Sequence, residues 1–329
     1  MKSLRTLAVA AAVGSILAGC GGTNGGFFDP APLPPGGVGD VSKVPPAPIP
    51  GQNDPPLTDA PAPTPPPATI EGVGTAAIAP STGFRFLRPG DYWQYYVTGR
   101  LTTQVIGGAN PSQNSRSITG TLTKTITTEI FDGQPVLKLT NRFVYNPQGG
   151  LPVTEVEELY LDQDGAANIT LLARRHTVGD NNVRIFARVT ETAFVQPGQW
   201  QPLTSASGQT DFVNDPSSPQ ENSRMNDTLT VTGSKDIATG LGRYGTWKTE
   251  RSTAIEYTFG DPVGAGQITR GDEAVAATEY WVPAIGSYVY RKTNTTRVWD
   301  VVDTFSPLTF RQQNYTFTTF EVLVSTTVQ

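Results

Sequence analysis

The chain has 329 residues, of which 37% are apolar, and its formal net charge at pH 7 is -5. A mildly acidic chain has no general attraction for phosphate backbones, so we expect no nucleic-acid partner. One cysteine and one histidine are too few for an internal disulfide or for a zinc site built from these residues.

Residues 1–19 have the layout of a secretory signal peptide. Lys2 and Arg5 supply positive charge, and the Ala-rich apolar run Leu7–Leu17 follows them. This run is too short to cross a bilayer, and small residues suited to cleavage come directly after it. The sequence therefore predicts export, with removal of this segment.

The cleavage site reads Leu17-Ala18-Gly19-Cys20, which resembles the bacterial lipobox. The resemblance implies that Cys20 is acylated on its thiol and on its new amine, so that membrane lipid is one partner. Two or three acyl chains make a stable anchor where a single chain does not. Gly21, rather than aspartate, follows Cys20, and in Gram-negative lipoproteins this favours the outer membrane of the envelope. An ordinary signal peptide with an incidental cysteine is the alternative.

Residues 20–80 are expected to be a disordered linker behind the lipidated cysteine. About half of all prolines lie between Pro30 and Pro67, and the few large apolar residues show no helical or alternating period. Such a segment cannot bury enough apolar surface to offset the entropy of ordering it. We interpret it as a tether, and a proline-rich ligand for a partner domain is the alternative.

From about Ser81 onward, short runs of aromatic and β-branched residues alternate with turn residues. Branching at Cβ favours a pleated strand, and no window carries a 3.6-residue apolar stripe with helix caps. Residues 81–329 are therefore predicted to form an all-β antiparallel domain, as one large curved sheet, a half-barrel or a sandwich. Strands are expected at 91–97, 119–130, 136–144, 154–161, 168–174, 183–192, 225–233, 245–259, 274–282, 287–296 and 315–328.

One polar, turn-rich stretch, Ser205–Asn222, is predicted to be a long mobile loop. As an alternative, this loop divides the β-region into two similar halves, and two stretches of the sequence resemble each other. Phe86–Gln94 and Phe194–Gln201 each contain Pro-Gly followed shortly by Trp-Gln. The β-region is thus either one domain or two similar halves.

Residues suited to catalysis are scarce. His176 is the only histidine available to a serine triad, and no Gly-x-Ser-x-Gly occurs in the mature chain. Glu155 and Glu157 share one face of an expected strand and Glu158 lies on the other, so carboxylate catalysis is a distant alternative. The turn Asp162–Gly165 opens like a calcium loop but lacks the later ligands. We expect no enzymatic activity, no metal site and no cofactor.

Aromatic residues gather in two short runs. Alternation places Tyr92 and Tyr96 on one face of a strand, with Trp93 and Tyr95 on the other, and it predicts that the two tyrosines of 288–290 share a face. An apolar groove for a lipid, glycan or peptide is one interpretation, and core packing between layers is the other. The candidate ligand-binding residues are Tyr92, Trp93, Tyr95, Tyr96, Tyr280, Trp281, Tyr288 and Tyr290.

Three aromatic stretches, Phe86–Tyr95, Gly245–Glu250 and Glu279–Val289, together resemble LolA/LolB-like periplasmic carriers and related lipoproteins. In that class a single antiparallel sheet curls around an apolar cavity, which helices close. The resemblance implies an open, curved sheet with an apolar ligand on its concave face, and the helices that would close it are missing from this sequence.

The sequence therefore predicts an envelope lipoprotein without enzymatic activity. Its β-domain would bind an apolar or extended ligand, such as a lipid or glycan, or a protein partner. A structural or surface-display module without a small-molecule ligand is the first alternative, and a carboxylate-dependent hydrolase of envelope polymers is the second.

Overall fold

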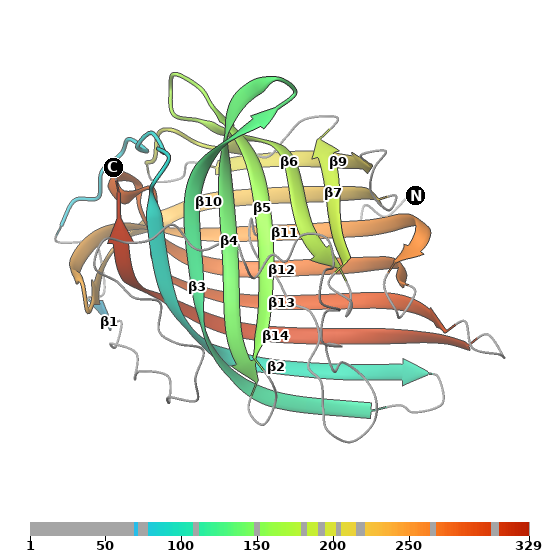
Figure 1. The fold of residues 1–329 in the computed structure, drawn as a ribbon. Coiled ribbons are helices and arrows are strands. Elements are labelled where there is room, and N and C mark those ends of the chain that lie inside the picture. The colour runs from blue at the N-terminus through green and yellow to red at the C-terminus, as the bar shows by residue number, and fades with distance from the viewer. Residues whose placement is uncertain are drawn as a thin grey trace, which may run out of the picture.

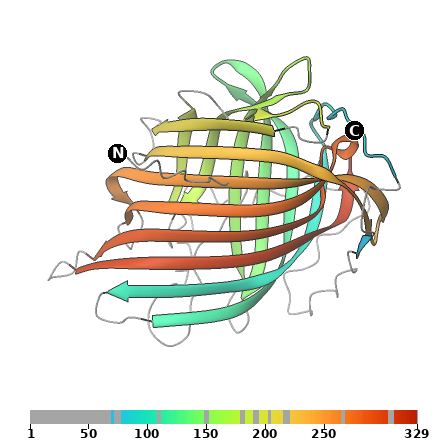
Figure 2. The ribbon, with the colours of Figure 1, turned by 180° about the vertical axis from the view of Figure 1, so that it is seen from behind.

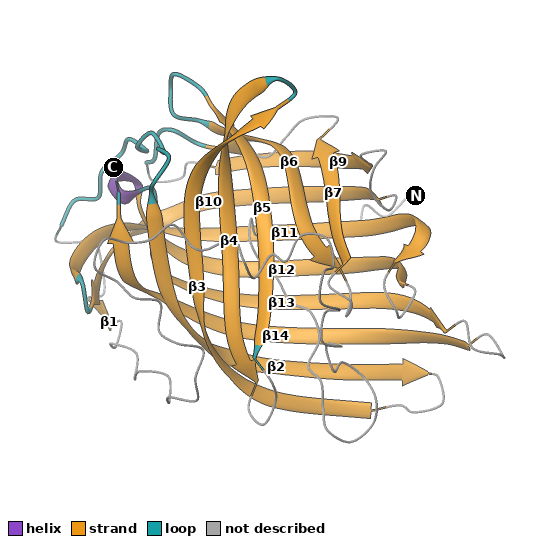
Figure 3. Ribbon diagram, viewed as in Figure 1, coloured by secondary structure: helices purple, strands orange, loops and turns teal. Residues whose placement is uncertain are grey.

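The computed structural model describes residues 69–71, 78–107, 112–147, 152–178, 183–189, 195–201, 205–214, 221–263, 268–303 and 309–328. These residues form strands and one short 3-10 helix, η2 (Pro283–Ile285). No helix among them is long and apolar enough to cross a bilayer. The strands are β1 (Thr69–Glu71), β2 (Tyr92–Gly107), β3 (Ser112–Phe131), β4 (Gln134–Pro147), β5 (Val153–Gln163), β6 (Ile169–Val178), β7 (Val183–Val189), β8 (Val195–Gln196), β9 (Ser205–Asn214), β10 (Glu221–Thr239), β11 (Gly242–Val263), β12 (Ile268–Val282), β13 (Ser287–Asp303) and β14 (Thr309–Thr327) (Figure 3).

Twelve of the described strands close into an antiparallel barrel. The order around the ring is β2-β3-β4-β5-β6-β7-β9-β10-β11-β12-β13-β14, and β14 pairs with β2. β1 and β8 lie outside the ring, on β10 and β6. Figures 1 and 2 show a flattened barrel, in which β3 to β7 form one wall and β10 to β14 with β2 form the other, running across it. Such crossing walls are a known way to pack two sheets around one core.

The predicted curved sheet, half-barrel or sandwich is therefore wrong, although the all-β antiparallel character is present. β9 closes the ring, because it pairs with β7 on one side and with β10 on the other. This strand occupies residues 205–214, which the sequence predicts to be part of a loop. Closure removes the free edges that an open sheet would present to other chains. Within the expected linker, residues 69–71 form β1, and most of the rest of it lies outside the described residues.

The ring contains six strands from each half of the chain, β2 to β7 and β9 to β14. The second of the two similar Pro-Gly stretches pairs with the residues just before the first one. The amide of Phe84 donates to the carbonyl of Gly198 at 2.8 Å, and the amide of Trp200 donates to the carbonyl of Thr82 at 2.7 Å. Both halves thus belong to one closed domain, and an origin by duplication stays a prediction.

Side chains along the strands alternate between a packed interior and a polar exterior. On β12 the residues from Glu273 to Trp281 that face inward are buried, and Asp272, Ala274 and Ala276 face outward. A membrane-spanning barrel needs a continuous apolar band on its outer face. The outward positions of the described strands carry no such band; examples are Arg100, Arg224, Asn226, Glu250, Ser252, Lys292, Asn294, Thr316 and Thr318.

One end of the barrel is covered by residues 81–91, which we call the strap. It runs from the linker to the start of β2, and Phe84 and Leu87 point from it into the core. Backbone and side-chain hydrogen bonds fasten it to four separate segments around the barrel end, so the strap is an integral part of that end. The bonds join Trp247 Nε1 to Ser81 O, Phe84 N to Gly198 O, Arg85 N to Pro283 O, and Leu87 N to Gln163 Oε1.

Gly120 on β3 is expected to be essential for closing the barrel, because a Cβ there would lie 2.3 Å from the carbonyl oxygen of Val144 and 2.8 Å from Tyr145 Cα. Both contacts are with backbone that cannot move without disturbing the β3–β4 pairing. Gly120→Ala should therefore lower the free energy of unfolding by about 2 kcal/mol or more, measured by urea denaturation of the mature chain. Gly165→Ala is the control, since nothing lies within 4 Å of its Cβ. Equal effects of both substitutions would contradict this account of the close approach.

Candidate functional site

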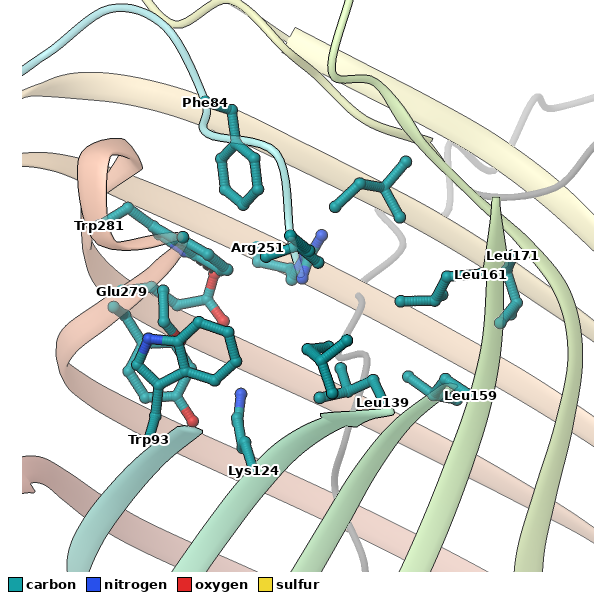
Figure 4. A pocket seen from close by; sticks show the side chains of 16 residues that line it. Phe84, Trp93, Lys124, Leu139, Leu159, Leu161, Leu171, Arg251, Glu279 and Trp281 are labelled. Carbon is teal, nitrogen blue, oxygen red and sulfur yellow. Dashed lines mark hydrogen bonds between the residues drawn. The ribbon is translucent and has the colours of Figure 1, made fainter. Parts of the chain in front are cut away.

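A cavity of about 80 Å³ lies beneath the strap, at the capped end of the barrel. Figure 4 shows Phe84 above it, with Trp93, Glu279 and Trp281 on one side and leucines on the other. Lys124 and Arg251 lie between these two sides. The cavity thus has an apolar half and a polar half. The leucines are Leu87, Leu139, Leu159, Leu161 and Leu171, and Ile126 and Ile169 extend the same surface.

The eight candidate aromatic residues divide between the two faces of the barrel wall. Trp93, Trp281 and Tyr288 line the cavity, and Tyr95 packs against Tyr288 with ring centroids 4.6 Å apart. The other four, Tyr92, Tyr96, Tyr280 and Tyr290, do not line the cavity, although Tyr92 and Tyr280 are also buried. Sequence alternation correctly separates Trp93 and Tyr95 from Tyr92 and Tyr96. Only the inward group contributes to the cavity.

Tyr288 and Tyr290 do not share a face, contrary to the prediction. Tyr290 pairs with Tyr280, whereas Tyr288 pairs with Trp281, so the register shifts by one residue between them. A β-bulge of this kind inserts one residue and reverses the side-chain alternation beyond it. The shift turns Tyr288 into the cavity, while Tyr290 packs against Tyr280 in a tilted arrangement, with ring centroids 5.7 Å apart.

A row of alternating charges crosses three strands just below the cavity. Glu279 on β12 pairs with Arg291 on β13, which pairs with Glu321 on β14. The guanidinium of Arg291 lies 3.1 Å from one carboxylate and 3.6 Å from the other. Glu321 also accepts a hydrogen bond from the hydroxyl of Tyr288. One buried cation therefore holds two buried carboxylates.

Glu279 stays ionised because its surroundings supply several donors and positive charges. Burial alone would raise the pKa of this carboxyl, but Arg251, Arg291 and the indole N–H of Trp281 outweigh burial and hold the pKa below its usual value. The Trp281 Nε1–Glu279 Oε2 distance is 2.7 Å, and Thr249 Oγ1 lies at 3.5 Å. Both oxygens of Glu279 are thus already engaged.

Asp227 lies beside Arg251 at 3.8 Å, and both side chains are almost fully buried. Burial raises the pKa of Asp227 to about 7, against the opposing effect of Arg251. A carboxyl with such a pKa is only partly ionised at neutral pH, so it neutralises Arg251 incompletely. Between about pH 4 and pH 7, Asp227 is protonated in the folded chain and ionised in the unfolded chain. The free energy of unfolding therefore falls as the pH rises through this range.

Lys124 differs from the other interior charges. Its side chain points into the cavity from β3, and only 8% of the residue is exposed. Within the described part of the chain, its amine has no hydrogen bond and no carboxylate within 4 Å. Its near neighbours are the rings of Tyr288 and Tyr95, with centroids 4.3 Å and 5.6 Å away. Burial, with the charge of Arg291, lowers the pKa of Lys124 to about 8.

The three glutamates considered as catalytic candidates form hydrogen bonds or ion pairs with neighbouring side chains of the barrel wall. Glu155 and Glu157 point inward and accept hydrogen bonds from Tyr145 and Asn141, at 3.1 Å and 2.9 Å. Glu158 points outward to Arg175 at 3.0 Å, so the predicted division of faces is confirmed.

Two further sequence candidates have ordinary structural roles. His176 packs beside Tyr257, with ring centroids 5.9 Å apart. Asp164 accepts hydrogen bonds from the amides of Ala166 and Asn168, which makes the calcium-like stretch a hairpin turn. No group of three or more metal-ligating residues occurs among the residues that the structure describes.

The interior cations are the residues that the sequence analysis missed. Lys124 lies in the Thr-rich run 119–130, and Arg251 and Arg291 lie in runs that read as polar strand faces. One signal was present: all three occupy the same alternation phase as buried aromatic or aliphatic residues on their own strands. A basic residue on the apolar side of a strand indicates an interior charge.

Arg291→Met is expected to destabilise the mature chain by about 3–5 kcal/mol, because it leaves Glu279 and Glu321 buried without their shared cation. The measurement is the free energy of unfolding from denaturant titration. Arg224→Met is the matched control: Arg224 pairs with Asp211 at 2.7 Å on the outer face, with half of its side chain exposed, and its loss should cost less than about 1 kcal/mol. Similar small losses for both variants would show that the charged row does not stabilise the barrel.

No protein-family model matches the chain, and no curated protein matches it. Among solved structures, OccK2 (OpdF) of Pseudomonas aeruginosa is 8% identical, with 74% of this chain and 100% of that chain covered and a TM-score of 0.22. An outer membrane channel from Pseudomonas putida F1 is 9% identical, with 73% and 98% covered and a TM-score of 0.16. Likenesses of this size carry no argument about family or activity, so the function has to be argued from the site itself.

Proposed function

We propose that the chain is a lipid-anchored, non-enzymatic protein of the cell envelope whose barrel binds a small ligand in the capped cavity. The observation that carries this proposal is the composition of the cavity wall. It combines an aliphatic surface around Leu139, Leu159 and Leu171 with one buried amine, that of Lys124. Many apolar contacts with a few convergent polar groups are what small-molecule sites in proteins generally provide.

The polar outer face supports attachment through Cys20. Entering a bilayer would cost free energy for a barrel whose outward strand positions carry Arg, Asn, Glu and Thr, because each charged group would have to leave water. Membrane association of this chain then depends on acyl chains at the N-terminus, and the tether places the barrel in the aqueous phase. An outer-membrane location in a Gram-negative host is part of the proposal, on account of Gly21.

The ion pairs of Glu273, Glu279 and Glu321 support a binding role over catalysis. A glycosidase needs two carboxyl groups that face a substrate across open space. Here Glu279 and Glu321 share Arg291, and Glu273 is bound by Arg297 at 2.6 Å. Groups held in this way stabilise the barrel interior and are not available to a substrate.

Fatty-acid labelling of cells that express the chain tests the anchor. Labelled palmitate is expected to be incorporated into the wild-type protein, and Cys20→Ser should abolish incorporation and release the protein from the membrane fraction. Substitution of Thr23 by serine is the control for a change nearby in the linker. An unlabelled wild-type protein, together with unchanged processing and fractionation of Cys20→Ser, would refute the anchor.

The cavity is tested by native mass spectrometry of the mature chain in nanodiscs, with hexan-1-ol as the apolar probe. The wild type should bind one hexanol. Leu139→Trp should prevent binding, because the indole would occupy the cavity. Leu241→Trp is the control, since Leu241 is an exposed turn residue remote from the cavity wall. If the wild type binds neither hexanol nor hexanoate, or if the Leu139→Trp variant binds hexanol equally well, the proposed function is overturned.

A further inference from the structure

The amine of Lys124 is a charged group in the cavity wall that has neither a hydrogen-bond acceptor nor a carboxylate within 4 Å in the described part of the chain. Four other charged side chains surround it from the opposite wall, namely Arg251 on β11, Glu279 on β12, Arg291 on β13 and Glu321 on β14. None of these carboxylates lies within 4 Å of the amine. A buried ammonium is unstable without an acceptor, so this position favours an acceptor supplied by a bound molecule.

The sign of charge in the cavity wall favours an anion. Three of the lining residues are charged: Lys124, Arg251 and Glu279. Glu279 is already bound by Arg291 and Trp281, so it offers nothing to a cationic ligand. Arg251 lies 3.8 Å from Asp227 and also acts on Glu279, so Lys124 is the lining cation that has no carboxylate within 4 Å. The wall thus presents net positive charge toward the cavity.

The other half of the wall limits what can accompany the anionic group. Leu139, Leu159 and Leu171 present aliphatic surface within the same cavity as Lys124 (Figure 4). The volume of about 80 Å³ is well below the roughly 300–1,000 Å³ of sites for drug-sized ligands. A ligand that fits must therefore be short, with one charged end and one apolar end.

We propose that the cavity binds a short-chain carboxylate, whose carboxylate accepts a hydrogen bond from Lys124 Nζ near Arg251 and whose alkyl chain lies against the leucines. This inference rests on the proposed function and adds the chemical class of the ligand. A carboxylate is preferred over a neutral alcohol because it supplies both an acceptor and a compensating charge for the buried cation. A primary amine of the same length would be repelled by Lys124 and Arg251.

Binding of the carboxylate should depend on pH through Lys124. The pKa of this amine is lowered to about 8, by burial and by Arg291 and Arg251, while Glu321 and Glu279 act in the opposite direction. The charge of Lys124 also lowers the pKa of Glu157 on β5, against the effect of burial. The phenol rings of Tyr95 and Tyr288 face the amine. Above pH 8 the free chain loses the cation, so carboxylate affinity should fall as pH rises, whereas a neutral probe should be insensitive.

The test is calorimetric titration of the mature chain in nanodiscs with hexanoate, hexan-1-ol and hexylamine, and empty nanodiscs correct for partitioning. At pH 7 hexanoate should bind at least tenfold more tightly than hexanol, and hexylamine should not bind. Lys124→Met should weaken hexanoate binding at least thirtyfold while hexanol affinity changes less than threefold. Lys292→Met, which removes an exposed lysine from β13, should alter neither.

A second measurement keeps the test decisive if Lys124→Met does not fold. In the wild type, hexanoate affinity should fall at least tenfold between pH 7 and pH 9.5, with hexanol affinity unchanged. If hexanol binds but hexanoate shows no advantage and no pH dependence, the carboxylate proposal is wrong and the binding cavity stands. If no probe binds, the proposed function itself fails.

Discussion

The pairing of β9 with both β7 and β10 is the constraint on which the rest of this structure depends. Without it the sheet would end in two free edges, and water would reach the inner face from the side. With it, the inner face is enclosed by hydrogen-bonded backbone, and charged side chains can be buried there only if they neutralise one another. The rows formed by Glu279, Arg291 and Glu321, and by Glu273 and Arg297, satisfy this condition.

Lys124 differs from these buried charges because no carboxylate lies within 4 Å of its amine in the described part of the chain. The buried arginines of these rows have a carboxylate within about 4 Å, whereas the lysine faces a small aliphatic space. An ion pair in the interior adds specificity or stability to a fold, but a lone ammonium does neither unless another molecule contributes the missing charge. The same low polarity that makes this group costly in the free chain would strengthen its interaction with a bound anion.

The sequence predicted most of the strands but not the way they close. The runs around Trp93, Leu122 and Trp281 alternate clearly, and the structure places strands at each of them. The closing strand, residues 205–214, consists of Ser, Ala, Gly, Gln, Thr and Asp over most of its length, so Phe212 is a single large inward residue without a periodic apolar pattern before it. The pairing that completes the ring between β14 and β2 joins residues as far apart in the sequence as Thr327 and Tyr92. Long-range pairing of this kind, and the bulge that reverses Tyr290, cannot be derived from local periodicity.

The strap also has a mechanical consequence. In chain order it lies between the proposed tether and the first strand of the ring. Tension along the linker would meet β1 first, which is joined to β10 by only three residue pairs, and the strap next. The hydrogen bonds of the ring would bear load only after both had detached. Under tension from the N-terminal side, the strap with Phe84 and Leu87 would therefore detach from the barrel end before the strands of the ring separate.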